Sequence, residues 1–159
     1  MKVSKSGLFL FELIVVIFLF TISSAICISI FAKSYTFSND SENLTISSLK
    51  AETVAEVFKD SDGKAEPIIK ALESDEGTHD IVVTGSDQSD AGQYTLILYY
   101  DKEWNNTDEH NSAYEITVKV KDIKKTTGGN LMEAQINVSH TKGNDKIFHM
   151  VAGKFVPNI

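Results

Sequence analysis

The pattern of hydrophobic and polar positions divides the chain into two parts. From Leu8 to Ala32 the side chains are apolar on every side of a helical projection, apart from one charge at Glu12 and a few small hydroxyl residues. A helix over this run is about 37 Å long at 1.5 Å per residue, which is enough to cross a hydrocarbon core of roughly 30 Å. The pattern therefore predicts a membrane segment, followed by a domain of ordinary soluble composition.

Helical spacing continues beyond the apolar run. Glu52, Glu56 and Lys59 fall on one side of the helix, whereas small and apolar residues recur at intervals of three and four on another. This second face consists of Leu44, Ser47, Ser48, Ala51, Val54, Ala55 and Phe58. We expect one helix from about Leu8 to Lys59, which is apolar all round at first and amphipathic later. The turn residues from Asp60 to Gly63 are expected to end it.

After a short helix expected from Pro67 to Glu73, the hydrophobic period changes to two, which is typical of strands. The candidate strands are Asp80 to Thr84, Tyr94 to Asp101, Tyr114 to Lys121, Leu131 to His140, and Lys146 to Phe155. The connection from Thr141 to Asp145 is short enough for a hairpin. The segments from Asp101 to Ala113 and from Asp122 to Asn130 are expected to be longer loops.

Two of these strands show a clean alternation that identifies their buried faces. The residues expected to be buried are Tyr114, Ile116, Val118 and Val120 on one strand, and Met132, Ala134, Ile136 and Val138 on the next. An antiparallel meander of this kind has one face available to receive the amphipathic half of the long helix. The predicted fold class is α+β, with a long N-terminal helix packed on an antiparallel sheet.

The charge balance argues against a nucleic-acid partner. The net charge is −7, and all fifteen basic residues are lysine. An acidic surface repels a phosphate backbone at long range, and without arginine there is no planar fork for phosphate or guanine recognition. We therefore expect no direct nucleic-acid binding.

The sequence contains no pattern that indicates catalysis or a cofactor. Its four histidines are scattered without metal-ligand spacing, and its one cysteine, Cys27, is read as a small hydrophobe in the apolar run. Ser139 and His140 are adjacent in a strand, so that their side chains are expected on opposite faces. We expect no enzyme activity, no metal and no cofactor. Trp104 lies in a polar loop, and we interpret its ring as pinning that loop to the domain; a contact with a neighbouring subunit or ligand is the alternative.

Three types of N-terminal segment fit the distribution of charge. Lysines precede the apolar run and acidic residues follow it, so that the N-terminus is expected to stay in the cytoplasm. A cleaved secretory signal would be cut after the small residues Ser23 to Ala25, and in a lipoprotein variant Cys27 would be acylated. An uncleaved signal anchor would place Glu12 about 6 Å into the helix, within reach of the headgroups. The third type is a leader that is cut on the cytoplasmic side.

The order Lys2, Lys5, Gly7, then Leu8-Phe9-Leu10-Phe11-Glu12 resembles the type IV prepilin signal. In that family a dedicated peptidase cuts after the glycine and methylates the new N-terminal residue, and a glutamate is the fifth residue of the mature chain. Cleavage between Gly7 and Leu8 would make Glu12 the fifth residue here. The family more often begins with phenylalanine followed by threonine, so Leu8 and the apolar Phe9 to Phe11 depart from its usual residue types.

The resemblance implies four regions: a leader at 1–7, a transmembrane and assembly helix at 8–33, its amphipathic continuation at 34–60, and an extracytoplasmic β-rich head at 61–159. It implies cleavage between Gly7 and Leu8 and N-methylation of Leu8. The partners that it implies are the prepilin peptidase, other pilin or pseudopilin subunits, the pilus assembly platform and membrane lipid. A carboxylate inside a membrane needs a partner. Cleavage would create a positive α-amine at Leu8, and we expect Glu12 to pair with that amine or with the amine of a neighbouring subunit.

The resulting expectation is a structural subunit, minor because its head is small, of a type IV pilus or of a secretion or competence pseudopilus. It would be anchored by one helix in a bacterial cell membrane, with its C-terminal domain outside. The alternative is a signal-anchored extracytoplasmic binding domain that does not polymerise.

Overall fold

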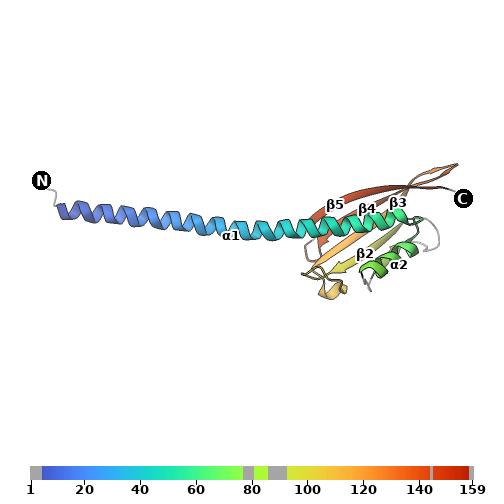
Figure 1. Cartoon of the computed structure of the whole chain (residues 1–159), viewed down its shortest axis with the longest axis horizontal. Coiled ribbons are helices and arrows are strands. Elements are labelled where there is room, and N and C mark those ends of the chain that lie inside the picture. Colours follow the sequence, from blue (N-terminus) through green and yellow to red (C-terminus); the bar gives the residue numbers. More distant parts are fainter. Residues whose placement is uncertain (1–4, 77–80, 86–92, 144, 158–159) are drawn as a thin grey trace. The chain divides into compact units, whose positions relative to one another are not determined.

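The structure, a computed structural model, describes residues 5–76, 81–85, 93–143 and 145–157 (Figure 1). Its elements are the helices α1 (Lys5–Asp60) and α2 (Ala65–Glu76), the 3-10 turn η1 (Glu109–Asn111), and the strands β1 (Val82–Gly85), β2 (Tyr94–Tyr100), β3 (Tyr114–Thr126), β4 (Gly129–His140) and β5 (Lys146–Pro157). The chain divides into two compact units, Met1–Glu42 and Asn43–Ile159. The second unit is called the head below.

The five strands form one antiparallel sheet in the order β1-β2-β3-β4-β5. Each strand pairs with its neighbour in the sequence, as the meander prediction requires. The predicted inward faces of β3 and β4 are confirmed, because all eight side chains are buried. Together with the long N-terminal helix, this sheet confirms the α+β prediction.

The part of α1 that belongs to the head packs on the sheet through a narrow face. Its buried residues are Ser47, Ala51, Val54, Ala55 and Phe58. The four apolar ones join the sheet's inner face and α2 residues Ile68 and Leu72 in one hydrophobic cluster. The prediction that Leu44 shares this face is wrong, because its side chain is 47% exposed. The packed face therefore begins at Ser47, one turn after Leu44.

The turn between α1 and α2 is fixed by hydrogen bonds and by a glycine. Ser61 donates its backbone N–H to Val57 O at 3.0 Å and its hydroxyl to Phe58 O at 2.8 Å, which satisfies carbonyls at the helix end. Gly63 adopts φ +81°, a region that favours glycine. The Tyr94 hydroxyl donates to Gly63 O at 3.0 Å, and burial raises the pKa of this phenol, with the Asp62 carboxylate adding to the rise. The predicted end of the helix between Asp60 and Gly63 is confirmed.

Two sequence predictions about α1 and α2 differ in extent from the structure. The helix α1 begins at Lys5, three residues before the expected start at Leu8, and it continues without a break through the polar run at residues 38–41, where Ser41 donates its hydroxyl to Phe37 O at 2.8 Å. The helix α2 begins at Ala65, two residues earlier than expected, with Pro67 in its first turn, where a missing N–H is tolerated. Of the first predicted strand, Asp80 lies outside the described residues.

The largest difference is in the connection between β3 and β4. Residues 122–130 are predicted as a loop, but β3 runs to Thr126 and β4 begins at Gly129, so that the loop is a tight hairpin. β5 pairs alongside it as far as Pro157 opposite Gly129. Since β2 pairs with β3 only as far as Val120, this part of the hairpin extends beyond β2. We call residues 121–131 the arm; Figure 1 shows it reaching past the last turn of α1.

Candidate functional site

The sequence-predicted processing residues all lie in the first turns of α1. Gly7, Leu8 and Glu12 are helical and exposed, and a Cβ placed on Gly7 would have nothing within 4 Å. Leu8 and Glu12 are four residues apart and therefore lie one above the other on the same face of the helix. The helix thus places Leu8 and Glu12 one turn apart on the same face, while their pairing after cleavage stays a prediction. Lys2 lies outside the described residues.

The helix around these residues is suited to a lipid environment. Phe9, Phe20 and Phe31 are 68%, 72% and 77% exposed, and one span beginning at Gly7 is long and apolar enough to cross a membrane by length and composition. Two hydroxyls in the apolar run are bonded within the helix: Thr21 donates to Phe18 O at 2.7 Å and Ser23 to Leu19 O at 3.0 Å. A polar side chain that satisfies itself in this way is compatible with hydrocarbon.

Exposed aromatic residues mark the other end of the apolar run. Phe31, Tyr35 and Phe37 are each at least 70% exposed and flank Lys33. Of these side chains, tyrosine and lysine are the ones that favour the boundary between hydrocarbon and water, because each has an apolar body and a polar end. Their position agrees with a membrane exit near residue 33.

The loop between β2 and β3 is attached to α1 at the first residue of the head. Trp104 is 7% exposed, stacks on Tyr114 with ring centroids 4.2 Å apart, and donates its indole N–H to Asn43 Oδ1 at 3.1 Å. These contacts agree with the interpretation that the ring pins the loop. Sequence reasoning missed Asn43 as the partner.

Asp101 organises this loop around the tryptophan. Its Oδ1 accepts the backbone N–H groups of Glu103 and Asn105, both at 2.9 Å. The hydrogen bonds from Asn105, its backbone N–H first, hold the pKa of the Asp101 carboxyl below its usual value. Trp104, between the two donors, adopts φ +61°, an unfavourable backbone conformation for a bulky residue, so the surrounding bonds must hold it there.

Ser139 and His140, which are adjacent in β4, make separate contacts. Ser139 donates its hydroxyl to Glu115 Oε1 at 3.1 Å, whereas the His140 ring packs against Tyr114 at 5.0 Å between centroids. The adjacent serine and histidine therefore have different neighbours. Within the described ranges, no three His, Cys, Asp or Glu side chains come together in a group that could hold a metal ion.

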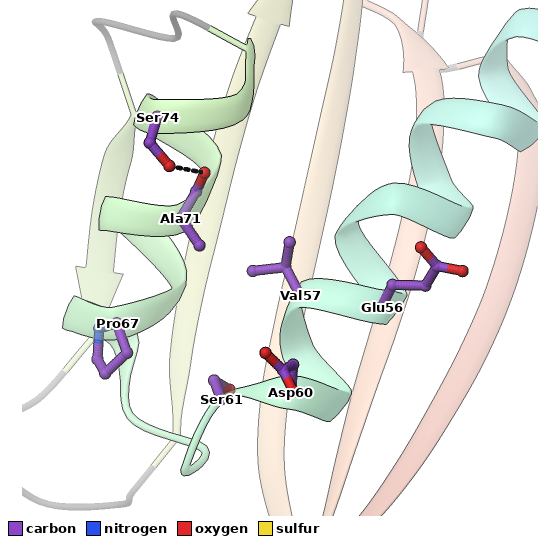
Figure 2. Close-up of a pocket in the computed structure, with 7 residues that line it drawn as sticks. All are labelled: Glu56, Val57, Asp60, Ser61, Pro67, Ala71 and Ser74. Atoms are coloured by element: carbon purple, nitrogen blue, oxygen red, sulfur yellow. Dashed lines mark hydrogen bonds between the residues drawn. The ribbon is translucent and has the colours of Figure 1, made fainter.

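A groove lies between the end of α1 and α2 (Figure 2). Its volume is about 530 Å³, and its lining residues are Glu56, Val57, Asp60, Ser61, Pro67, Ala71 and Ser74. Figure 2 shows Val57 on the α1 wall near Asp60 and Ser61, with Pro67 and Ala71 on α2. The groove thus combines an apolar lining with the acidic residues Glu56 and Asp60, of which Glu56 directs its carboxylate away from α2 in Figure 2. Its residues come from two helices, and the sequence pattern did not indicate it.

Comparison with known protein families finds no matching family model, and comparisons with curated proteins and with solved structures find no match. The class that the fold itself supports is a protein with one long apolar N-terminal helix and an antiparallel β-sheet head. This layout is compatible with a pilin-like or a signal-anchored protein.

Proposed function

We propose that this chain is the precursor of a pilin-like structural subunit, minor in abundance, of a type IV pilus or of a secretion or competence pseudopilus. A prepilin peptidase cuts it between Gly7 and Leu8 and methylates Leu8. The mature subunit then joins other pilin or pseudopilin subunits through its N-terminal helix, with the help of the pilus assembly platform. It has no catalysis of its own.

One observation carries this proposal. Gly7 stands at the start of a helix whose following side chains are apolar and exposed, and Glu12 lies one turn beyond Leu8 on the same face. Cleavage after Gly7 would turn the Leu8 backbone nitrogen into a positive amine close to the membrane surface. That amine, from the same chain or from a neighbouring subunit, is the partner that a carboxylate in hydrocarbon requires.

The position of the aromatic residues supports the same topology. With Leu8 at one end of the apolar run and the rings around Lys33 at the other, the run matches the thickness of a bilayer. The N-terminus would lie in the cytoplasm and the head outside, in contact with lipid only through the helix.

Substitution of Glu12 tests the assembly role. Glu12→Ala should leave membrane insertion and cleavage unchanged but reduce incorporation into filaments roughly tenfold or more, because it leaves one member of a buried pair without its partner. Thr21→Ala is a matched control, since its hydroxyl is bonded within the helix to Phe18 O. Incorporation measured by quantitative immunoblotting of sheared filaments should be unchanged in this control. Equal incorporation of the Glu12→Ala variant would contradict the charge-pairing role.

The second candidate is a signal-anchored extracytoplasmic domain that does not polymerise. It is favoured by the depth of Glu12, which lies about 6 Å into the apolar run and can reach the headgroups without any partner. In this case the chain would keep its first seven residues, so that the two functions are distinguished by the N-terminus of the protein from membranes.

A further inference from the structure

We propose that the head has a self-association surface, in which the arm of one copy docks in the α1–α2 groove of a second copy. The inference extends the proposed assembly role from the membrane helix to the head. It rests on complementary features of two surfaces of the same chain, and it names a contact that does not depend on cleavage at Gly7.

The groove offers an apolar lining with negative charge. Val57, Pro67 and Ala71 provide the apolar part, while Glu56 and Asp60 are exposed carboxylates one helical turn apart. Within the part of the chain that the structure describes, neither carboxylate forms an ion pair. The groove therefore matches a side chain or segment that pairs an apolar body with a positive group.

The arm offers the complementary features. Lys124 is exposed, and Ile123 beside it is 50% exposed at a bulge where β3 shifts register against β4. A bulge re-aims side chains and locally interrupts the regular pairing of two strands. Nearby on the other two strands, Leu131 and Phe155 are 37% and 55% exposed and pair opposite each other. An apolar surface with a free lysine at its margin is what the groove would accept.

The net charges of the two surfaces also match. Among the charged side chains of the arm that the structure describes, Lys121 and Lys124 stand against one acidic residue, Asp122, whereas the groove has Glu56 and Asp60 and no lysine among its lining residues. Of the arm's lysines, Lys121 is already paired with Glu133 at 3.0 Å. Lys124 forms no ion pair with the residues that the structure describes.

The arm and the groove are different surfaces of the same head. When the arm of one copy occupies the groove of a second copy, the groove of the first and the arm of the second stay available for further copies. A contact of this kind is heterologous, and it generates either a ring or an open helical array, depending on the rotation between copies. An open array is the arrangement that a filament subunit needs.

Charge reversal tests the contact in the full chain, purified in a non-ionic detergent. Asp60→Lys in the groove and Lys124→Glu on the arm should each weaken self-association about tenfold by sedimentation equilibrium, as expected when an exposed attraction becomes a repulsion. Neither variant is expected to unfold the head, because a lysine at the C-terminal end of α1 is favoured by the helix dipole and Lys124 is exposed. Circular dichroism checks this point.

Mixing the two variants gives the decisive result. In an equimolar mixture, the positive groove of Asp60→Lys can bind the negative arm of Lys124→Glu, and the unchanged arm of the first variant can bind the unchanged groove of the second. Association should therefore return to within about threefold of wild type. The control substitutions Glu73→Lys on α2 and Lys142→Glu in the β4–β5 turn reverse exposed charges outside both surfaces and should change nothing. Three results would overturn the proposal: a mixture that does not recover, an equal loss of association in the controls, or a wild-type chain that is monomeric.

The same preparations separate this contact from the proposed function. The mass of the N-terminus reports cleavage at Gly7 in every variant, and the charge reversals in the head should leave it unchanged. A chain that associates through its head but keeps residues 1–7 would contradict the pilin function and support the contact. A chain that is cleaved after Gly7 but does not associate would support the pilin function and contradict the contact.

Discussion

The indole N–H of Trp104 donates to Asn43 Oδ1 across 61 residues of sequence, at 3.1 Å. This bond joins the loop between β2 and β3 to the helix α1 at the first residue of the head. Trp104→Phe keeps a ring but removes the donor, and it should lower the free energy of unfolding by about 1 kcal/mol. Asn43→Ala should cost about 1–3 kcal/mol for the unpaired N–H, partly offset by the better helix propensity of alanine.

A double-mutant cycle separates the hydrogen bond from these other effects. Urea unfolding of the two single variants and of the double variant, followed by circular dichroism in a non-ionic detergent, gives the coupling energy. We expect a favourable coupling between the two side chains. Additive effects would show that the bond contributes nothing to stability.

The Asp101 carboxylate should make the Trp104 loop sensitive to acid. Hydrogen bonds in the folded state lower the pKa of this group, so that its contribution to stability is present above the unfolded pKa of about 3.9 and is lost as the pH falls through the lower folded value. Tryptophan fluorescence, which reports the chain's one tryptophan, should shift to the red in this acid range. In Asp101→Asn the acid-dependent shift should be much reduced; an identical pH profile would contradict the role of the carboxylate.

Gly63 should tolerate no side chain. Its φ of +81° is unfavourable for other residues, and a Cβ there would lie 2.4 Å from the Met132 sulfur. We expect Gly63→Ala to destabilise the head by about 1–3 kcal/mol, through backbone strain and overpacking. Gly143→Ala is the control, because its nearest contact, an Asp145 oxygen at 3.7 Å, is an ordinary one. Thermal unfolding should separate the two variants by several degrees, and equal melting temperatures would count against the turn geometry.

The sequence predicted those parts of the fold in which a periodic pattern reports burial directly. The alternation from Tyr114 to Val120 identified an inward strand face because every second side chain there belongs to the buried core cluster. The spacing from Ser47 to Phe58 identified the packed face of α1 in the same way. The prediction that Leu44 belongs to this face was wrong because the hydrophobic period continues along the helix beyond the last residue that packs on the head.

The arm and the Trp104 attachment could not be read from a pattern. The sequence from Lys124 to Thr127 shows no alternation of apolar and polar residues, although the backbone of β3 pairs with β4 as far as Thr126 opposite Gly129. The turn residues Gly128 and Gly129 were the available signal for a tight connection. The pair Trp104 and Asn43 depends on the folded path of the chain, for which nothing in the local sequence gives a signal.

The central claim is that the chain begins, in its mature form, at Leu8. Intact-mass and N-terminal peptide mass spectrometry of protein extracted from membranes tests it most directly. The account predicts a chain that starts at Leu8 and is heavier by one methyl group on its α-amine. A chain that keeps Met1, or one that starts near Ile26 after conventional signal cleavage, would contradict it.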